Sequence, residues 1–217
     1  GTSPAQSIPL NWNIAPTNPI YIVRSPLKEQ SQSKKDLAIV SWGLIAPWLS
    51  DTAEAKTSQS RAINARSESV HEKPTFKDAF KQRRCLVPAQ GYYEWATALG
   101  RYKPKQAFYI SSLDGAQLSI AGIWSSWRAP NGEVIESASI ITQEAQGELA
   151  TIHSRMPVFM PHDRWDAWLD PENKEIENLR NLMVVQSPEA IVKAHPVSSH
   201  VNSVANNGAQ LTQAIEL

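Results

Sequence analysis

The sequence predicts an α+β fold with a β-rich core. Short β-prone runs recur along the chain with connections of hairpin length, a pattern that favours an antiparallel or mixed sheet. Most helical patterns come after residue 145. No Pro/Gly/Ser-rich linker divides the 217 residues. We therefore expect a single domain over residues 1–217, with helices at the periphery of the sheet.

The first two strands are expected to be joined by a polar hairpin loop over residues 25–36, and five further strands follow. In chain order, the predicted strands are Ile20–Val23, Leu37–Trp42, Leu86–Ala89, Tyr92–Trp95, Ala107–Ser111, Leu118–Trp124 and Ser137–Thr142. The polar stretch Leu49–Ser60 follows the second strand, and we interpret it as mobile.

The predicted helices are short. Phe76 and Phe80 lie four residues apart, which places both rings on one face of a helix over residues 76–81. Later patterns predict a weak helical turn over Gln146–Ile152, helices over Asp163–Leu169 and Asn173–Met183, and a short helix that begins with Ser187 as a cap and Pro188 in the first turn.

Composition is typical of a globular protein, with 41% hydrophobic and 19% charged residues. No apolar run approaches the roughly 20 residues of a membrane span. Cys85 is the single cysteine and fits a reducing compartment, so we expect a cytoplasmic protein without disulfides. The start, Gly1–Pro4, has neither a signal-peptide pattern nor an initiator Met and is interpreted as a processed or truncated end.

The net charge is zero, but the charges are unevenly distributed. Residues 61–105 are rich in Lys and Arg, whereas residues 131–217 contain more Asp and Glu. This asymmetry permits a local anion-binding face on a neutral protein. Interspersed, solvated charges are the alternative explanation.

The segment Cys85–Trp95 carries the main candidate for catalysis, because it places Glu94 among three aromatic rings. Side chains alternate on a strand, so Tyr92 and Glu94 share one face while Tyr93 and Trp95 share the other. Loss of hydration raises the pKa of a carboxyl and prepares it for acid or base chemistry. The alternative is a glutamate on the solvated face of an amphipathic strand.

His153 is the second candidate, with Arg155 two residues further on. An imidazole with its unperturbed pKa of about 6.5 both donates and accepts protons near neutral pH. A single histidine is more often structural or solvated. The remaining histidines are interpreted as weaker candidates or as surface residues.

Asn64 and Arg66 share one face if their segment is extended, and Arg is the residue best suited to bidentate contact with phosphate. Loop anchoring and a surface charge are the alternatives. Trp48 follows Pro47 at the edge of a polar stretch, where it could stack on a nucleic-acid base or pack in the core. No zinc-ligand spacing and no glycine-rich phosphate loop is present, so no metal or cofactor is expected.

Cys85 is also a candidate nucleophile of a thiol peptidase, which would need a thiolate near a base such as His153. Its neighbours Leu86 and Val87 are apolar. An apolar strand hides the sulfur and raises the pKa of the thiol, so a buried packing role is the preferred interpretation.

Six segments, taken together and in order, resemble the SOS-response-associated peptidase (SRAP) family, whose members attach covalently to abasic sites in single-stranded DNA. Each segment alone would be weak, but together they cover nearly the whole chain. They are Asn13–Thr17, Trp42–Trp48, Ile63–Glu68, Cys85–Trp95, His153–Pro157 and His195–Ser198.

The resemblance implies a barrel-like core and a DNA-damage function in which an N-terminal cysteine forms a thiazolidine crosslink. It implies that Asn64 orients the N-terminal residue, Glu94 transfers protons during imine formation and His153 assists sugar ring opening. For DNA binding, it implies phosphate contacts from Arg66 and Arg155 and base stacking by Trp48. A self-processing peptidase activity is a further expectation.

The chain departs from the family pattern because it begins at Gly1 and has no N-terminal cysteine. We interpret this as truncation, and we expect the printed chain to be inactive in crosslinking. The expected partner is single-stranded DNA containing abasic sites, bound by a monomer in a bacterial cytoplasm without metal or membrane. The alternatives are a thiol peptidase using Cys85 and His153, and a non-enzymatic nucleic-acid-binding module.

Overall fold

The computed structural model describes residues 7–26, 35–97 and 102–217, and its largest sheet closes into a barrel. Five strands follow the order β2-β1-β4-β7-β8, and a parallel pairing of β2 with β8 closes the ring. The other neighbours in the ring pair antiparallel. The strands are β1 (Pro19–Arg24), β2 (Asp36–Trp42), β4 (Arg84–Ala89), β7 (Leu118–Arg128) and β8 (Val134–Glu144).

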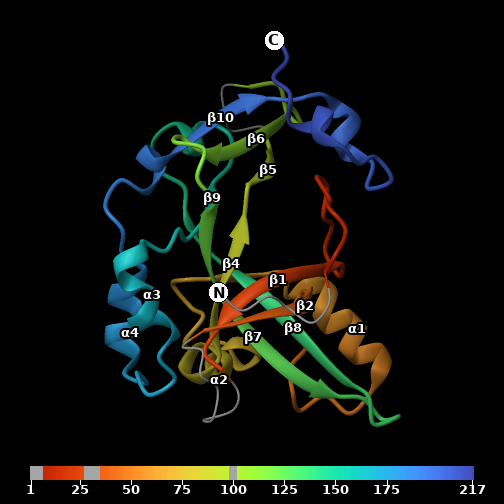
Figure 1. Ribbon diagram of the computed structural model, residues 1–217, viewed down its shortest axis with the longest axis vertical. Helices are drawn as coiled ribbons and strands as arrows, with labels where there is room; N and C mark the ends of the chain where they lie inside the picture. Colours follow the sequence, from red (N-terminus) through yellow and green to blue (C-terminus); the bar gives the residue numbers. More distant parts are fainter. Residues whose placement is uncertain (1–6, 27–34, 98–101) are drawn as a thin grey trace.

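Two short strands extend β8 beyond the barrel: β3 (Asn64–Arg66) pairs parallel to it, and β9 (Arg155–Pro157) pairs antiparallel. A second, three-stranded sheet has the order β10-β6-β5. Its strands are β5 (Gly91–Trp95), β6 (Ala107–Ser112) and β10 (Val192–Pro196). Figure 1 shows β5 rising from the barrel toward this second sheet, so the Cys85–Trp95 segment joins the two sheets.

The described α-helices lie outside the barrel, with α3 and α4 together on one side and α1 on the other (Figure 1). They are α1 (Thr52–Arg61), α2 (Pro74–Gln82), α3 (Trp165–Leu169) and α4 (Ile176–Met183). Short 3₁₀ helices occupy η1 (Gly147–Thr151), η2 (His162–Arg164), η3 (Pro188–Ile191), η4 (Ser199–Asn202) and η5 (Ala209–Thr212). None of the helices in the described ranges is long and apolar enough to cross a membrane.

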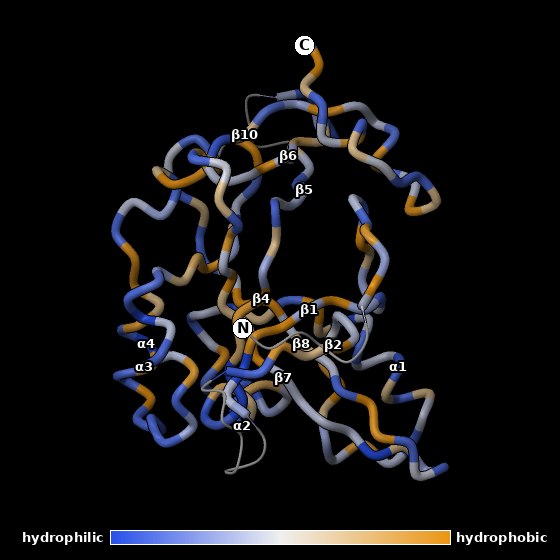
Figure 2. The backbone as a smooth tube through the Cα atoms, viewed as in Figure 1, coloured by the Kyte–Doolittle hydropathy of each residue, from blue (hydrophilic) through white to orange (hydrophobic). Residues whose placement is uncertain are grey.

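The buried apolar side chains of the described residues form four clusters, and strand alternation separates the two largest. One side chain set fills the barrel and the space under the second sheet, and includes Ile22, Cys85 and Trp124. The other packs the outer face of the barrel against the helices, and includes Phe80, Ile123 and Trp168. In Figure 2, which colours the backbone by hydropathy, hydrophobic stretches are clear around β1 and β4.

The N-terminal segment is fastened to the C-terminal part of the chain. The buried Asn13 amide donates to the backbone carbonyls of Val201, Ser203 and Asn206, at 3.1, 3.0 and 3.3 Å. The Trp12 N–H donates to Asn207 Oδ1 at 2.8 Å. Segments far apart in the sequence therefore lie side by side.

The α+β, β-rich fold class is confirmed, including the barrel-like core, and all seven predicted strands are present within a few residues of their expected bounds. Predictions for the hairpin loop at residues 27–34 and for the Gly1–Pro4 end lie outside the described residues. Helix α4 begins at Ile176 rather than Asn173, and the helical turn near residue 150 and the Pro188 helix are both 3₁₀. Ser187 makes no side-chain cap bond and has a φ of 46°.

The interpretation of Leu49–Ser60 as a mobile stretch is wrong, because most of it folds as α1. Asp51 Oδ1 accepts from the backbone N–H groups of Ala53 and Glu54, at 2.8 and 2.9 Å, which starts the helix. Only Ala55 of this helix is buried. A helix with so small a buried face has no apolar stripe for periodicity to reveal.

Candidate functional site

Glu94 lies on β5, where the chain has just left the barrel, and pairs in register with Phe108 of β6. Gly91 permits the close approach of these strands, because a Cβ there would lie 2.5 Å from the Ile110 carbonyl oxygen. Tyr92 shares the inner face with Glu94, and its ring centroid lies 6.3 Å from that of Phe159. Aromatic surroundings therefore remove water from one side of the carboxylate.

The environment of Glu94 raises the pKa of its carboxyl. Burial is the main cause, and it outweighs the opposite effects of nearby His153 and of the Trp95 backbone N–H. That N–H donates to Glu94 Oε1 at 3.2 Å. The side chain nevertheless keeps 27% of its surface exposed. A desolvated carboxyl that a ligand can reach is suited to proton transfer.

His153 lies in the turn between η1 and β9, directly beside Glu94. Its Nδ1 is 3.8 Å from Glu94 Oε2, and its side chain is 31% exposed. Two backbone bonds hold the turn: the His153 N–H donates to the Leu149 carbonyl at 3.0 Å, and the Thr97 N–H after β5 donates to the Ile152 carbonyl at 2.9 Å. The pair is thus fixed through the main chain on both sides.

The tautomer of neutral His153 follows from its hydrogen bonding. The backbone N–H of Arg155 donates to Nδ1 at 3.1 Å, and this shorter contact favours the tautomer with the proton on Nε2; in the other tautomer Nδ1 would donate to the Arg155 carbonyl at 3.3 Å. Neutral His153 therefore presents an N–H donor at Nε2. With Glu94, it forms an acid/base pair in which each group can hold one proton.

Asn64 and Arg66 both project from β3 with exposed side chains, on either side of the fully buried Ala65. The strand is held in place by Trp42, whose Nε1 donates to the Ile63 carbonyl at 3.0 Å. Among the residues that the structure describes, neither side chain has a hydrogen-bond or ion-pair partner. Both are available to a ligand.

Arg155 lies next to His153, but its guanidinium is occupied. Nη1 and Nη2 donate to the two Glu68 oxygens at 2.7 and 2.9 Å, and Nη2 also donates to the Thr142 carbonyl at 2.6 Å. The Arg155 guanidinium in turn is the main cause that lowers the pKa of Glu68. Sequence reasoning assigned no role to Glu68 or Thr142, although an acid two residues after Arg66 was a visible signal.

Trp48 is 53% exposed in the loop between β2 and α1, and no contact within the described ranges joins it to Glu94 or His153. The structure thus brings Glu94, His153 and Arg155 together through direct contacts. Asn64 and Arg66 join this group through β8, because Arg66 pairs with Thr142, the same residue whose carbonyl accepts from Arg155.

Cys85 does not meet the requirements of a nucleophile. Its side chain is fully buried inside the barrel, and burial raises the pKa of its thiol. A Cβ on the facing Gly122 would lie only 3.0 Å from the sulfur, so there is no room for a substrate. The sulfur is a packing atom, as the apolar strand indicated.

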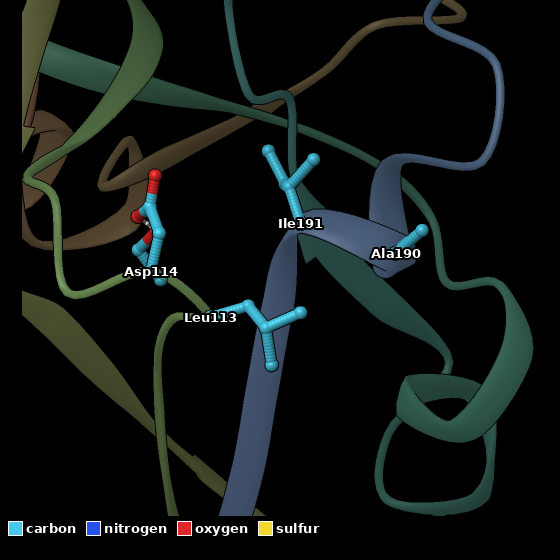
Figure 3. A pocket seen from close by; sticks show the side chains of 5 residues that line it. Leu113, Asp114, Ala190 and Ile191 are labelled. Atoms are coloured by element: carbon cyan, nitrogen blue, oxygen red, sulfur yellow. Dashed lines mark hydrogen bonds between the residues drawn. The ribbon is translucent and has the colours of Figure 1, made fainter.

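The hollow in Figure 3 is lined by Ser112 of β6, by Leu113 and Asp114 after it, and by Ala190 and Ile191 of η3, and none of these is a predicted site residue. Within residues 7–26, 35–97 and 102–217, no group of three or more His, Cys, Asp or Glu side chains could hold a metal ion.

The chain is similar to two named relatives, one bacterial and one from a vertebrate. It is 32% identical to the abasic site processing protein YoaM of Bacillus subtilis, over 94% of this chain and 85% of that protein. It is 31% identical to the abasic site processing protein HMCES of Xenopus tropicalis, over 88% of this chain and 61% of that protein.

Solved structures show the same fold. A crystal structure of a protein from Bacteroides thetaiotaomicron matches with a TM-score of 0.75 and 25% identity, over 89% of this chain and 80% of that chain. One from Bordetella bronchiseptica matches with a TM-score of 0.73 and 27% identity, over 85% and 86% of the two chains. The family model of the SOS response associated peptidase (SRAP) matches residues 2–204 of the sequence. The chain therefore belongs to this family.

Proposed function

We propose that this protein processes abasic sites, binding single-stranded DNA and forming a covalent thiazolidine crosslink through an N-terminal cysteine. The observation that carries the proposal is the Glu94–His153 pair, with 3.8 Å between Oε2 and Nδ1 and both side chains partly open to solvent. The names of the relatives YoaM and HMCES support abasic-site processing as the general activity.

The chemistry needs a proton donor and acceptor at one place. A ring-opened abasic sugar is an aldehyde, and a neutral α-amine adds to its carbon to give a carbinolamine. Glu94, with its raised pKa, protonates the departing hydroxyl, which leaves as water and yields the protonated imine; the Glu94 carboxylate can then take the proton from the imine nitrogen. The cysteine thiol then adds to the imine carbon and closes the five-membered ring.

The other predicted residues take supporting roles. His153 assists opening of the sugar ring, for which the donor at Nε2 is suited. Asn64 orients the N-terminal residue, Arg66 binds a phosphate, and the exposed indole of Trp48 stacks on a base. Their exposed side chains support these assignments.

Cys85 supplies no peptidase nucleophile in this scheme, because its sulfur is buried. The nucleophile is the terminal cysteine, and the printed chain begins with Gly1. We place the protein in the cytoplasm, where a free terminal thiol stays reduced.

The test is a denaturing gel with single-stranded DNA that contains one abasic site. Two proteins are compared: the printed chain, and a version encoded with a Met-Cys-Gly-Arg start, in which removal of the initiator Met exposes the cysteine at the N-terminus. A heat-stable shifted band from the second protein alone is expected. An oligonucleotide with a tetrahydrofuran analogue, which has no aldehyde, is the matched control and should give no band. If the cysteine-bearing version gives none with the true abasic site, the crosslinking function is rejected.

A further inference from the structure

Glu68 covers the part of Arg155 that a DNA phosphate would use. It follows β3 in the chain, and its two oxygens face the two terminal nitrogens of Arg155 at 2.7 and 2.9 Å. A carboxylate and a phosphate present the same pair of acceptor oxygens to a guanidinium. Glu68 therefore occupies the position of a phosphate on Arg155.

The guanidinium of Arg155 has no second pair of nitrogens open to a bidentate contact. Nη2 also donates to the Thr142 carbonyl at 2.6 Å, and Nε is buried without a hydrogen-bond partner among the described residues. A phosphate can therefore make a bidentate contact with Arg155 only where Glu68 now sits. Arg155 as it stands thus contacts a carboxylate rather than solvent.

The two partners differ in how firmly they are held. The Arg155 side chain is only 22% exposed and is anchored to Thr142 of β8, while the Glu68 side chain is 53% exposed. Glu68 is the group that can move into water without disturbing the strands. The Thr142 carbonyl keeps a second bond, from the Ser67 N–H at 2.8 Å, which holds the start of the Glu68 segment in place.

We propose that Glu68 is an electrostatic gate: its carboxylate occupies Arg155 in the free protein and leaves when a phosphate of single-stranded DNA takes its place. This rests on the proposed function. The gate makes Arg66 the first phosphate contact, because Arg66 has no partner to displace, and Arg155 the second. It weakens binding of any single strand, so noncovalent retention is low and the covalent step decides which strands are kept.

The salt dependence of DNA binding distinguishes a gate from an ion pair that only stabilises the fold. When a phosphate displaces Glu68, the released carboxylate stays near the DNA and cancels one positive charge. Replacing Glu68 by Gln removes that cancellation, so one more phosphate charge is neutralised. For single-stranded DNA, one more neutralised phosphate steepens the slope of the logarithm of the binding constant against the logarithm of the salt concentration by about 0.7. Loss of the competing exposed ion pair should also tighten binding by about two- to fivefold.

The experiment measures fluorescence anisotropy of a labelled single-stranded oligonucleotide with a tetrahydrofuran abasic analogue, at several sodium chloride concentrations. This probe has no aldehyde, so binding is read without crosslinking. The proteins are the parent chain, Glu68→Gln, and the control Glu144→Gln, which removes an equal charge from the β8 residue in register with Arg155. Circular dichroism verifies that each variant is folded.

A double variant, Glu68→Gln with Arg155→Met, tests whether the tighter DNA binding of Glu68→Gln depends on Arg155. If Arg155→Met unfolds the protein, Arg155→Lys replaces it. The gate predicts a steeper slope and tighter binding for Glu68→Gln, a parent-like slope for Glu144→Gln, and loss of the gain in the double variant. Parent-like or weaker binding by Glu68→Gln overturns the gate while leaving the proposed function intact. No binding by any protein, the parent included, rejects both.

Discussion

At the scale of single residues, Glu94 shows how one position combines burial with access. Its neighbour on the inner face of the strand, Tyr92, is aromatic, yet the Glu94 carboxylate lies beside His153 and its side chain keeps 27% of its surface exposed. The sequence predicted the aromatic flanks because they are adjacent in the chain. The sequence also named His153, but local pattern could not place its imidazole beside Glu94, because it comes from the turn between η1 and β9.

Burial also makes Glu94 a source of pH-dependent stability. Because its pKa is raised in the folded chain, the folded state binds this proton more tightly than the unfolded state does. Stability from this group is therefore fully present below the unfolded carboxyl pKa of about 4.3 and is lost as pH rises through the folded-state pKa. Glu94→Gln is expected to flatten this decline and to raise the melting temperature near neutral pH.

Thermal denaturation between about pH 4 and about pH 8 checks this expectation. Glu144→Gln, at an exposed position, is the control and should follow the parent. Parallel curves for the parent and Glu94→Gln would mean that burial does not disfavour the Glu94 carboxylate.

Cys85 gives a second prediction for a single residue. A thiol reagent should leave the folded protein unmodified and should react fully after denaturation, because the sulfur is buried. Cys85→Ala, made in the version with an N-terminal cysteine, should keep crosslinking activity and lose stability on the order of 1 kcal/mol. Rapid labelling of Cys85 in the folded parent chain would restore the thiol peptidase as a candidate.

At the scale of elements, strands were easier to predict than helices. Alternation and β-branched runs mark the barrel strands, whereas α1 buries one alanine and depends on its cap. Asp51→Ala should destabilise the protein by about 1 kcal/mol in urea denaturation, since two N–H groups lose their acceptor. Asp51→Asn keeps an acceptor and should stay near the parent. Equal losses in the two variants would assign the effect to charge instead of capping.

The number of basic residues in a stretch of sequence does not show how many of them are exposed to bind an anion. Arg84 belongs to the basic stretch that suggested an anion-binding face, but it is buried and holds helix ends. Its Nη1 donates to the Phe80 carbonyl at 2.9 Å, and its Nε donates to the Trp168 carbonyl at 2.7 Å. Desolvation lowers its pKa to about 10, which leaves it charged at neutral pH. This cation stabilises α2 and α3 and offers nothing to DNA.

At the scale of the whole molecule, pairing between strands far apart in the chain determines which residues become neighbours, and the sequence alone could not predict these pairings. Barrel closure depends on Ser41 pairing with Ser137. The site depends on β3 and β9 pairing with β8, and on the end of β5 meeting the turn before β9. Such pairings leave little local pattern, because each strand only needs to be β-prone. Residue types were therefore predictable, while their neighbours, including Glu68 on Arg155, were not.

The hydrogen bonds from the Asn13 amide to the C-terminal part of the chain, here called the Asn13 clamp, are a long-range contact that can be tested directly. Asn13→Leu leaves the Val201, Ser203 and Asn206 carbonyls without their donor and should cost about 1–3 kcal/mol of stability. Urea denaturation measures the loss. Asn178→Ala, on the exposed face of α4, is the matched control and should change stability little. Similar values for both variants would show that the clamp contributes nothing to folding.

The proton-transfer role of Glu94 is tested most directly by the single-turnover rate of crosslinking to abasic single-stranded DNA. The version with an N-terminal cysteine is compared with its Glu94→Gln and Glu144→Gln variants, and anisotropy with the tetrahydrofuran analogue verifies equal binding. Glu94→Gln is expected to slow crosslinking by about 10²- to 10⁴-fold, the range for a lost general acid or base, with binding unchanged. A rate equal to that of Glu144→Gln would contradict the role of Glu94 in catalysis.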